Sequence, residues 1–416
     1  MSFRTALSGL NAASADLRTT GNNIANSGTV GFKESRAEFA DVFAVSQGGV
    51  SKTAIGSGVR LSAVNQQFTQ GNIDFTGKNL DMAISGDGFF ILNDGGAPVY
   101  SRAGNFEVDR NGTVVNNQGH SLQVYPRQGE SRDSFDLSTT QDLRLGTSEA
   151  PPRATERVET RFNLPSGAEV PDSDFAIDDP ASFNHSTTVT VYDSLGQSHD
   201  ATLYLQAAER GDDPEIGGRW NAYLAINGEV LPDDDGDPLA QELVFGRDGK
   251  IANGSELSFG SFDPANGADE LDISFDMDEA TQYGGSFSVT SLSQDGFSTG
   301  SLSGVDIDSS GVVFARFTNG QAQSLGKVAL ANFANPQGLQ QLGDNVWGET
   351  FAAGERLRGE AGEGGLGMIQ SGGLEGSNVD IAQQLVNLIT AQRNFQANAQ
   401  VISTADTITQ TIINIR

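Results

Sequence analysis

The sequence predicts an α+β protein, mainly β, in which nested β-rich domains lie between long N- and C-terminal helices that pair as a coiled-coil-like inner core. Three observations predict this class. Apolar residues follow a seven-residue period at both ends of the chain. Between the ends, short apolar runs alternate with turn sequences. The chain has 51 glycines and only 12 prolines in 416 residues, a balance that suits the many tight turns of a β-rich protein.

The N-terminal helix is predicted over residues 1–28, and Asn26-Ser27-Gly28 ends it with residues that stop helices. Ordering roughly 25 residues costs ~1–2 kcal/mol each in backbone entropy. Each apolar side chain returns only ~1.5–3 kcal/mol when it is buried. We therefore expect this helix to draw its stability from neighbours. Its predicted apolar seam, with spacings of seven and four residues, consists of Phe3, Leu7, Leu10, Leu17 and Ile24.

The C-terminal helix is predicted within residues 377–416, with Ser377 and Asp380 as a capping pair. Asparagine and glutamine side chains separate its apolar residues, so the flanks are polar but nearly uncharged. Such flanks suit crowded packing against many copies of one helix. Packing within the core of a single molecule is the alternative. The predicted seam, which changes register near residue 401, consists of Ile381, Leu385, Leu388, Phe395, Ile402, Ile408 and Ile412.

The middle of the chain is predicted as strands. The turn at residues 109–112 and the turn at residues 308–311 both begin with Asp, end with Gly and separate short apolar runs. This likeness suggests that the two regions belong to one domain, split by an insertion. The predicted organisation is helix 1–28, linker 29–70, first part of a β domain 71–148, inserted outer β domain 149–289, second part of the β domain 290–355, linker 356–376 and helix 377–416.

Composition excludes several functions. A formal charge of −29 argues against binding nucleic acid or an anionic lipid surface. The absence of cysteine excludes disulfides, thiol catalysis and zinc–thiolate sites. Because no stretch of 18 apolar residues occurs and the start lacks a basic region followed by an apolar one, we expect a soluble chain without membrane insertion or a cleaved signal peptide.

The sequences that resemble motifs for catalysis or ligand binding each lack a required residue or spacing. The glycines from Gly71 to Gly77 are one residue too far apart for a phosphate-binding loop, and Asn79 replaces the required Ser or Thr. The acidic run 233–237 lacks the first ligand of a calcium loop, since Leu231 would occupy that position. His120, His185 and His199 lack the spacing of metal ligands. We expect no enzyme activity, cofactor or metal.

Two stretches near the ends carry a family resemblance. Residues 20–26 with 29–33 resemble the N-terminal signature of the flagellar rod/hook/junction axial proteins, and residues 378–380, 385–393 and 396–398 resemble their C-terminal signature. The resemblance extends over essentially the whole chain. In the N-terminal signature, Gly31, Phe32 and Lys33 are expected to form the turn that leaves the first helix. The signature residues are Asn22, Asn23, Ala25, Asn26, Gly31, Phe32 and Lys33.

Internal stretches resemble the hook members of that family in particular. These are residues 191–196, 291–297 and 330–339. The inserted segment and the short, glycine-rich connector from Phe39 to Leu61 argue against distal rod and junction proteins. Outside the family, the alternative is a secreted acidic adhesin or calcium-binding β protein, for which folded monomers are expected.

The resemblance implies a structural role. Its members build a hollow, flexible tube that transmits motor torque, and their helical ends are disordered during type III export and fold on assembly. The implied place is outside the cell, in the hook and basal body of the bacterial flagellum. The implied partners are further copies of the chain, the hook cap protein, the distal rod protein, the hook–filament junction proteins and the flagellar export apparatus.

Overall fold

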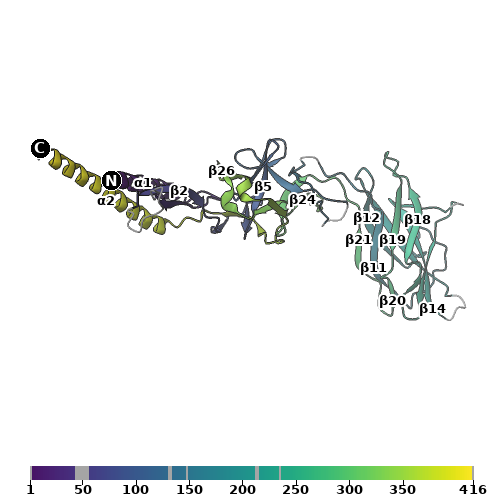
Figure 1. Ribbon diagram of the computed structural model, residues 1–416. Helices are drawn as coiled ribbons and strands as arrows, with labels where there is room; N and C mark the ends of the chain where they lie inside the picture. Colours follow the sequence, from purple (N-terminus) through teal and green to yellow (C-terminus); the bar gives the residue numbers. More distant parts are fainter. Residues whose placement is uncertain are drawn as a thin grey trace. The chain divides into compact units, whose positions relative to one another are not determined.

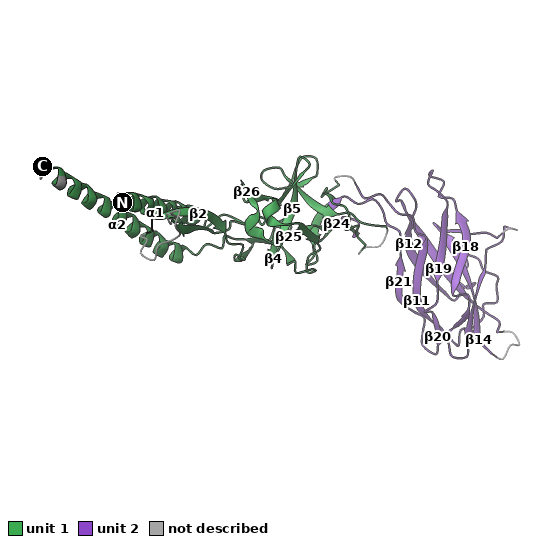
Figure 2. Ribbon diagram, in the orientation of Figure 1, with its two compact units in different colours: residues 1–147, 303–316, 322–416 green, residues 148–302, 317–321 purple. Residues whose placement is uncertain are grey.

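The computed structural model describes residues 2–42, 56–129, 134–146, 149–210, 215–233 and 236–414. The chain divides into two compact units (Figure 2). Unit 1 comprises residues 1–147, 303–316 and 322–416, and unit 2 comprises residues 148–302 and 317–321. One helix near each end of the chain and many strands between them confirm the predicted α+β, mainly β class.

The two helices of unit 1 are α1 (Ser2–Ala25) and α2 (Ile381–Asn414), and they lie side by side (Figure 1). They run antiparallel, since Asn23 near the end of α1 contacts Gln384 near the start of α2. Low-charge sequences without proline favour helix over both ranges. The pairing therefore brings the two ends of the chain together.

Asp380 caps α2 as predicted. Its Oδ1 accepts hydrogen bonds from the backbone N–H groups of Ala382 at 2.8 Å and Gln383 at 3.2 Å. Ser377 acts one turn earlier, where its Oγ accepts a hydrogen bond from the N–H of Val379 at 3.3 Å. Asp380 alone thus satisfies N–H groups of the first turn, while Ser377 shapes the approach to the helix.

A β-hairpin packs against α1. It consists of β1 (Ser35–Asp41) and β2 (Val59–Gln66), which pair antiparallel in a two-stranded sheet. The sequence predicts a linker over residues 29–70, so these strands correct that expectation. Glycines between the strands suggested a loose connector, but polar and apolar residues alternate over residues 36–39 and 59–63. Residues 43–55 of the connector lie outside the described residues.

The main sheet of unit 1 has 13 strands among the described residues. It joins strands from both sides of the intervening segment, because β24 pairs with β9, β25 with β5 and β27 with β6. Its strands are β5 (Phe89–Asp94), β6 (Ala97–Ser101), β7 (Glu107–Val108), β8 (Val114–Val115), β9 (Ser121–Tyr125), β10 (Gln141–Asp142), β22 (Leu302–Ile307), β23 (Val312–Phe317), β24 (Ala322–Val328), β25 (Leu330–Phe333), β26 (Gln340–Gly343), β27 (Val346–Gly348) and β28 (Arg356–Gly359). Two short 3-10 helices, η1 (Pro336–Gly338) and η2 (Phe351–Ala353), lie between its last strands.

Two small antiparallel sheets connect the helices to this domain. β3 (Ile73–Phe75) pairs with β30 (Gly373–Glu375), and β4 (Met82–Ser85) pairs with β29 (Met368–Ser371). The segment 356–376, predicted as a linker, therefore contains three strands. Because its glycines support turns between these strands, the segment is a folded part of unit 1 and not a linker.

Unit 2 contains two sheets among its described residues. The five-stranded sheet holds β11 (Arg157–Pro165), β18 (Glu256–Phe262), β19 (Leu271–Asp276), β20 (Thr281–Tyr283) and β21 (Ser288–Gln294). The six-stranded sheet holds β12 (His185–Tyr192), β13 (Ser198–Ala208), β14 (Ile216–Ile226), β15 (Glu229–Val230), β16 (Gln241–Gly246) and β17 (Ile251–Asn253). The predicted boundary at residue 289 falls inside β21, which pairs with β11.

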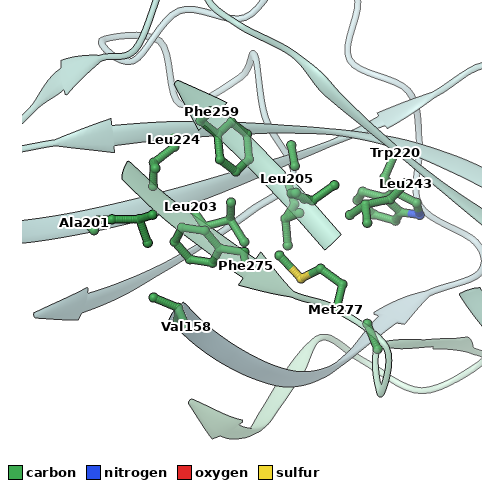
Figure 3. Close-up of a cluster of buried hydrophobic side chains, with 14 of the residues drawn as sticks. Val158, Ala201, Leu203, Leu205, Trp220, Leu224, Leu243, Phe259, Phe275 and Met277 are labelled. Carbon is green, nitrogen blue, oxygen red and sulfur yellow. The ribbon is translucent and has the colours of Figure 1, made fainter. Parts of the chain in front are cut away.

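A continuous apolar core fills unit 2 (Figure 3). Exposed and buried residues alternate along β11, as a strand with one buried face requires. Leu203 and Leu205 of β13, Trp220 of β14 and Phe275 of β19 all lie in this core and are nearly inaccessible to solvent. The large apolar side chains of this core thus point inward.

Candidate assembly interface

The contact between α1 and α2 is built from small and polar residues. On α1, Ala6, Ala13 and Thr20 are buried at seven-residue intervals. On α2, Gln384 and Ala391 are buried at the same interval. Short side chains at these positions let the two helix backbones approach closely.

Gly9 shows how close that approach is. An ideal Cβ atom at Gly9 would lie 2.4 Å from Oδ1 of Asn398, well inside van der Waals contact. Asn398 is held there, because its Nδ2 donates a hydrogen bond to the backbone O of Asn394 at 2.8 Å. A larger residue at position 9 would have to displace Asn398 or separate the helices.

The large apolar residues of the predicted seam on α1 lie beside this contact. Phe3 is 50% exposed and Leu7 is also exposed, while Leu10, Leu17 and Ile24 are half-buried. The buried line of Ala6, Ala13 and Thr20 lies four residues, about one helical turn, before the expected Leu10, Leu17 and Ile24. Because the short side chains hold the helices close together, the contact has no room for a row of leucines.

On α2 the predicted seam divides. Leu388, Phe395 and Ile402 are half-buried, whereas Ile381 and Ile408 are exposed and Leu385 is 46% exposed. The side chain of Ile412 lies outside the described residues. Further large apolar side chains that are exposed on α2 are Val386, Ile389, Val401 and Ile413. The outer apolar face, as we call it, consists of Phe3 and Leu7 of α1 with Ile381, Leu385, Val386, Ile389, Val401, Ile408 and Ile413 of α2.

α2 extends past the start of α1. The contacts of Asn23 with Gln384 and of Gly9 with Asn398 set the register of the pair, and this register places Ser2 opposite Ala405. Residues 406–414 therefore continue about 14 Å beyond α1, at about 1.5 Å per residue. This overhang lacks α1 as a partner, and it carries the exposed Ile408 and Ile413.

Asn23, a signature residue, ties three segments together where the helices meet the hairpin. Its Nδ2 donates to the backbone O of Ser35 at 2.8 Å, and its Oδ1 accepts from the N–H of Ser35 at 2.9 Å. The same Nδ2 lies 3.3 Å from Oε1 of Gln384, whose Nε2 donates to Glu34 Oε1 at 2.8 Å. Asn23 is buried, so its substitution would leave backbone groups of β1 without partners.

The other asparagines of the signature close the end of α1. Asn26 Nδ2 donates to Oδ1 of Asn22 at 2.6 Å and to the backbone O of Asn22 at 3.0 Å. Ala25, the last residue of α1, is exposed. These contacts are local and stop the helix, as the sequence predicts.

Gly31 and Phe32 form the turn that leads away from α1. Gly31 has a φ of +69°, and its N–H donates to the backbone O of Glu375 at 2.8 Å. An ideal Cβ at Gly31 would lie 2.5 Å from the backbone N of Ala103, so both conformation and space require glycine. Phe32 is buried next to it.

Lys33 is buried and paired. Its Nζ donates to Oε1 of Glu375 at 2.7 Å and to the backbone O of Thr69 at 2.8 Å. Arg102 Nη1 lies 3.7 Å from the other carboxylate oxygen of Glu375. Burial lowers the pKa of Lys33, and the Glu375 carboxylate opposes that shift. We call Lys33, Arg102 and Glu375 the ionic node.

The sequence did not predict that Glu375 and Arg102 are the partners of Lys33. Charged residues are common in this acidic chain, so their type gives no signal. The position of Glu375 between glycines, in Gly373-Leu374-Glu375-Gly376, was the one available hint of a crowded site. The partner of Lys33 could not be deduced, because 342 residues separate the two.

In unit 2, Asp193 organises the turn within residues 191–196. Its Oδ1 accepts from the N–H groups of Leu195 and Gln197, and its Oδ2 accepts from Asn266 at 2.6 Å. His199 Nε2 lies 3.1 Å from the same oxygen, and Asn227 Nδ2 lies 2.8 Å from His199 Nδ1. Burial raises the pKa of Asp193, but these hydrogen bonds together outweigh it and hold the pKa below its usual range.

The remaining histidines have ordinary surroundings. The His185 ring stacks on Phe287 with centroids 4.4 Å apart, and burial lowers its pKa. His120 lies 3.7 Å from Asp94. Within the described ranges, no group of three or more His, Cys, Asp or Glu side chains could hold a metal ion. The same residues contain no helix that is long and apolar enough to cross a membrane.

Four family profiles match the sequence. The flagellar basal body rod protein profile matches residues 3–33, and the flagellar hook protein FlgE/F/G D1 domain matches residues 83–170. The flagellar basal body protein FlaE D2 domain matches residues 163–297, and the flagellar basal body rod FlgEFG protein C-terminal profile matches residues 370–415. These profiles, with the paired terminal helices, define the class: an axial structural protein of the bacterial flagellum.

Known relatives of the chain identify one family within this class. The flagellar hook protein FlgE of Salmonella typhimurium is 38% identical over 427 residues, covering 100% of both chains. The same protein of Escherichia coli is 37% identical, and that of Borreliella burgdorferi is 32% identical, each over 100% of this chain. A crystal structure of Helicobacter pylori flagellar hook protein FlgE2 shares the fold, with a TM-score of 0.55 at 14% identity over 73% of this chain and all of the other. The chain belongs to the flagellar hook protein FlgE family.

Proposed function

We propose that the chain is a structural subunit of the bacterial flagellar hook. Copies of it would assemble into a hollow, flexible tube that transmits motor torque from rod to filament for swimming. The observation that supports this most strongly is the outer apolar face, which the described contacts of one molecule leave exposed. Large apolar side chains exposed in this way on paired helices mark an interaction surface.

The partner that this face fits best is a second copy of the chain. Burying each large apolar side chain returns ~1.5–3 kcal/mol. In a homopolymer this gain recurs in every subunit, and subunits related by a rotation that does not close form an open helix. The predicted role of Phe3, Leu7, Leu10, Leu17, Ile24, Ile381, Leu385, Leu388, Phe395, Ile402, Ile408 and Ile412 in packing between subunits is part of this proposal.

The other assignments follow from this role. The predicted inserted domain at residues 149–289, which falls within unit 2, would lie on the outside of the tube. The ends of the tube would meet the hook cap protein, the distal rod protein and the hook–filament junction proteins. The subunit would reach the cell exterior through the flagellar export apparatus with unfolded arms and without a cleaved signal peptide. Its work would be mechanical, with no catalysis.

Assembly can be tested with purified protein. We expect raised salt to screen the charge of −29 and to yield hollow tubes in negative-stain electron microscopy. Leu385→Asp with Ile389→Asp places charges on the outer apolar face and should abolish the tubes. The control, Gln396→Asp, adds charge at an exposed polar position of α2. Polymers that survive the double substitution, or their absence in the unaltered protein, would contradict the proposal.

A further inference from the structure

Two stretches of unit 2 carry no Asp, Glu, Lys or Arg. Residues 148–302 contain 30 Asp and Glu residues against seven Lys and Arg residues, yet residues 180–192 and 280–294 contain none of these four types. These stretches include β12 and β21, which lie at the edges of the two sheets and contact each other. One side of this acidic unit is therefore bounded by two uncharged edge strands.

The other edge strands of unit 2 are short or interrupted. β15, β17 and β20 have two or three residues each. β18 begins with the exposed Glu256, and its register shifts around Gly260, whose φ is +82°. Short strands, charges and bulges are the usual means by which a sheet edge avoids pairing with another chain. β12 has none of them, since it pairs with β13 over eight residues without a register shift.

The hydrogen bonds at the end of β12 show which of its backbone groups point outward. The N–H of Asp193 donates to the backbone O of Gln197, so the odd-numbered residues of β12 form the hydrogen-bonded pairs with β13. The even-numbered residues point away from β13. Tyr192 agrees with this, because its N–H donates to Oγ1 of Thr155 at 3.0 Å and its O accepts from the N–H of Thr155 at 2.9 Å.

Ser186, Thr188 and Thr190 form the open part of this edge. All three are exposed, and among the described residues their outward N–H and C=O groups have no hydrogen-bond partner. Facing inward, Thr187 and Val189 are only half-buried, although Val189 packs against the core of unit 2. A strand added here would satisfy the backbone groups and complete the cover of the core.

From this edge we propose that β12 of one copy pairs antiparallel with β12 of a second copy, so that unassembled subunits form a two-fold dimer through unit 2. A register centred on Thr188 places this residue opposite itself and Ser186 opposite Thr190, which uses every open group. A second copy fits because it brings an equally uncharged strand, whereas an acidic segment would be repelled by unit 2. The contact closes on two copies, so it is separate from the contacts of an open helix and does not rest on the proposed hook function.

The place of Thr188 on the two-fold axis allows a test by charge reversal. Thr188→Lys and Thr188→Glu each put two like charges directly opposite each other in the dimer, so each should raise the dissociation constant at least about threefold. Mixed in equal amounts, the two variants put opposite charges there and should form a heterodimer at least about tenfold tighter than either homodimer. Ser261→Lys, at an exposed position of the edge strand β18, is the matched control and should dimerise like the unaltered protein.

Sedimentation equilibrium of the full-length protein measures these constants, with Leu385→Asp and Ile389→Asp in every sample to keep tubes from forming. Denaturant unfolding of unit 2 should be the same in all variants, which shows that each of them folds. A chain with native β12 that stays monomeric up to about 1 mM would overturn the proposal. So would a mixture of Thr188→Lys and Thr188→Glu that pairs no better than either variant alone. Tubes that form from a chain without dimers would leave the proposed function intact, so the two failures are distinguishable.

Discussion

Unit 2 and the helical pair use their apolar residues in opposite ways. In unit 2 many large apolar side chains form a buried core, in which Trp220, Leu224 and Phe275 are almost completely buried. In the helical pair the close contact holds alanine, glycine and amides, while the leucines and isoleucines are half-buried beside it or exposed. Unit 2 therefore carries its own core, whereas the pair presents its apolar surface to something else. Unit 2 can therefore be stable alone, whereas the helical pair is completed by assembly.

The largest effect on the monomer is expected in unit 2. Trp220→Ala removes a large side chain from the core and should lower the free energy of unfolding of unit 2 by about 3–5 kcal/mol. Denaturant unfolding followed by circular dichroism measures this loss. Hydrogen exchange in α1 and α2 should not change, since these helices belong to the other unit. A loss below about 1 kcal/mol would show that the core is not what stabilises unit 2.

A smaller effect is expected at the close contact within the helical pair. Gly9→Leu forces a side chain against Asn398 and should weaken docking of α1 by about 1–3 kcal/mol. Exchange of the α1 amides reports this loss. Gly21→Leu is the matched control, because no heavy atom lies within 4 Å of an ideal Cβ there. That substitution should leave docking intact and slightly favour the helix. Equal behaviour of the two variants would refute the close packing.

Acid should weaken unit 2 through Asp193. Hydrogen bonds from Asn266, His199 and the backbone hold its pKa below the unfolded value, despite burial. A carboxyl group with a depressed pKa contributes stability above its unfolded pKa of about 3.9 and loses it as the pH falls through the folded value. Unfolding of unit 2 should therefore require less denaturant as the pH drops from about 5 to about 3. In Asp193→Asn this dependence should be smaller, and an unchanged slope would contradict the assignment.

The smallest effect on the monomer is expected on the outer apolar face. Leu385→Ala removes an exposed side chain, so the free energy of unfolding should change by less than about 0.5 kcal/mol. The same substitution should raise the protein concentration needed for polymer formation at least tenfold, because it removes a buried contact from every subunit. Sedimentation of polymers against salt and protein concentration measures this, with Gln396→Ala as the control. A stability loss as large as that of Trp220→Ala would show that Leu385 is a core residue of the monomer.

Periodicity predicted much of this fold and a part of the interface. It located both helices, the capping role of Asp380 and the β-rich middle. The seven-residue repeat of leucines could not tell which line of residues faces the partner helix, because alanine and glycine lines with the same period run beside it. The hairpin β1–β2 was hidden by the glycines between its strands. The ionic node was beyond prediction, since charges that meet across hundreds of residues leave no local pattern.

The central claim is that other copies of the chain bury the outer apolar face. The chain has no cysteine, so Leu385→Cys introduces a single thiol whose reaction rate can be followed in monomers and in salt-induced polymers. Leu224→Cys, at a position that is 1% exposed in the core of unit 2, sets the rate of a protected thiol. We predict that the thiol at position 385 reacts rapidly in monomers and at least a hundredfold more slowly in polymers, close to the protected rate. Equal rates in monomers and polymers would contradict the account.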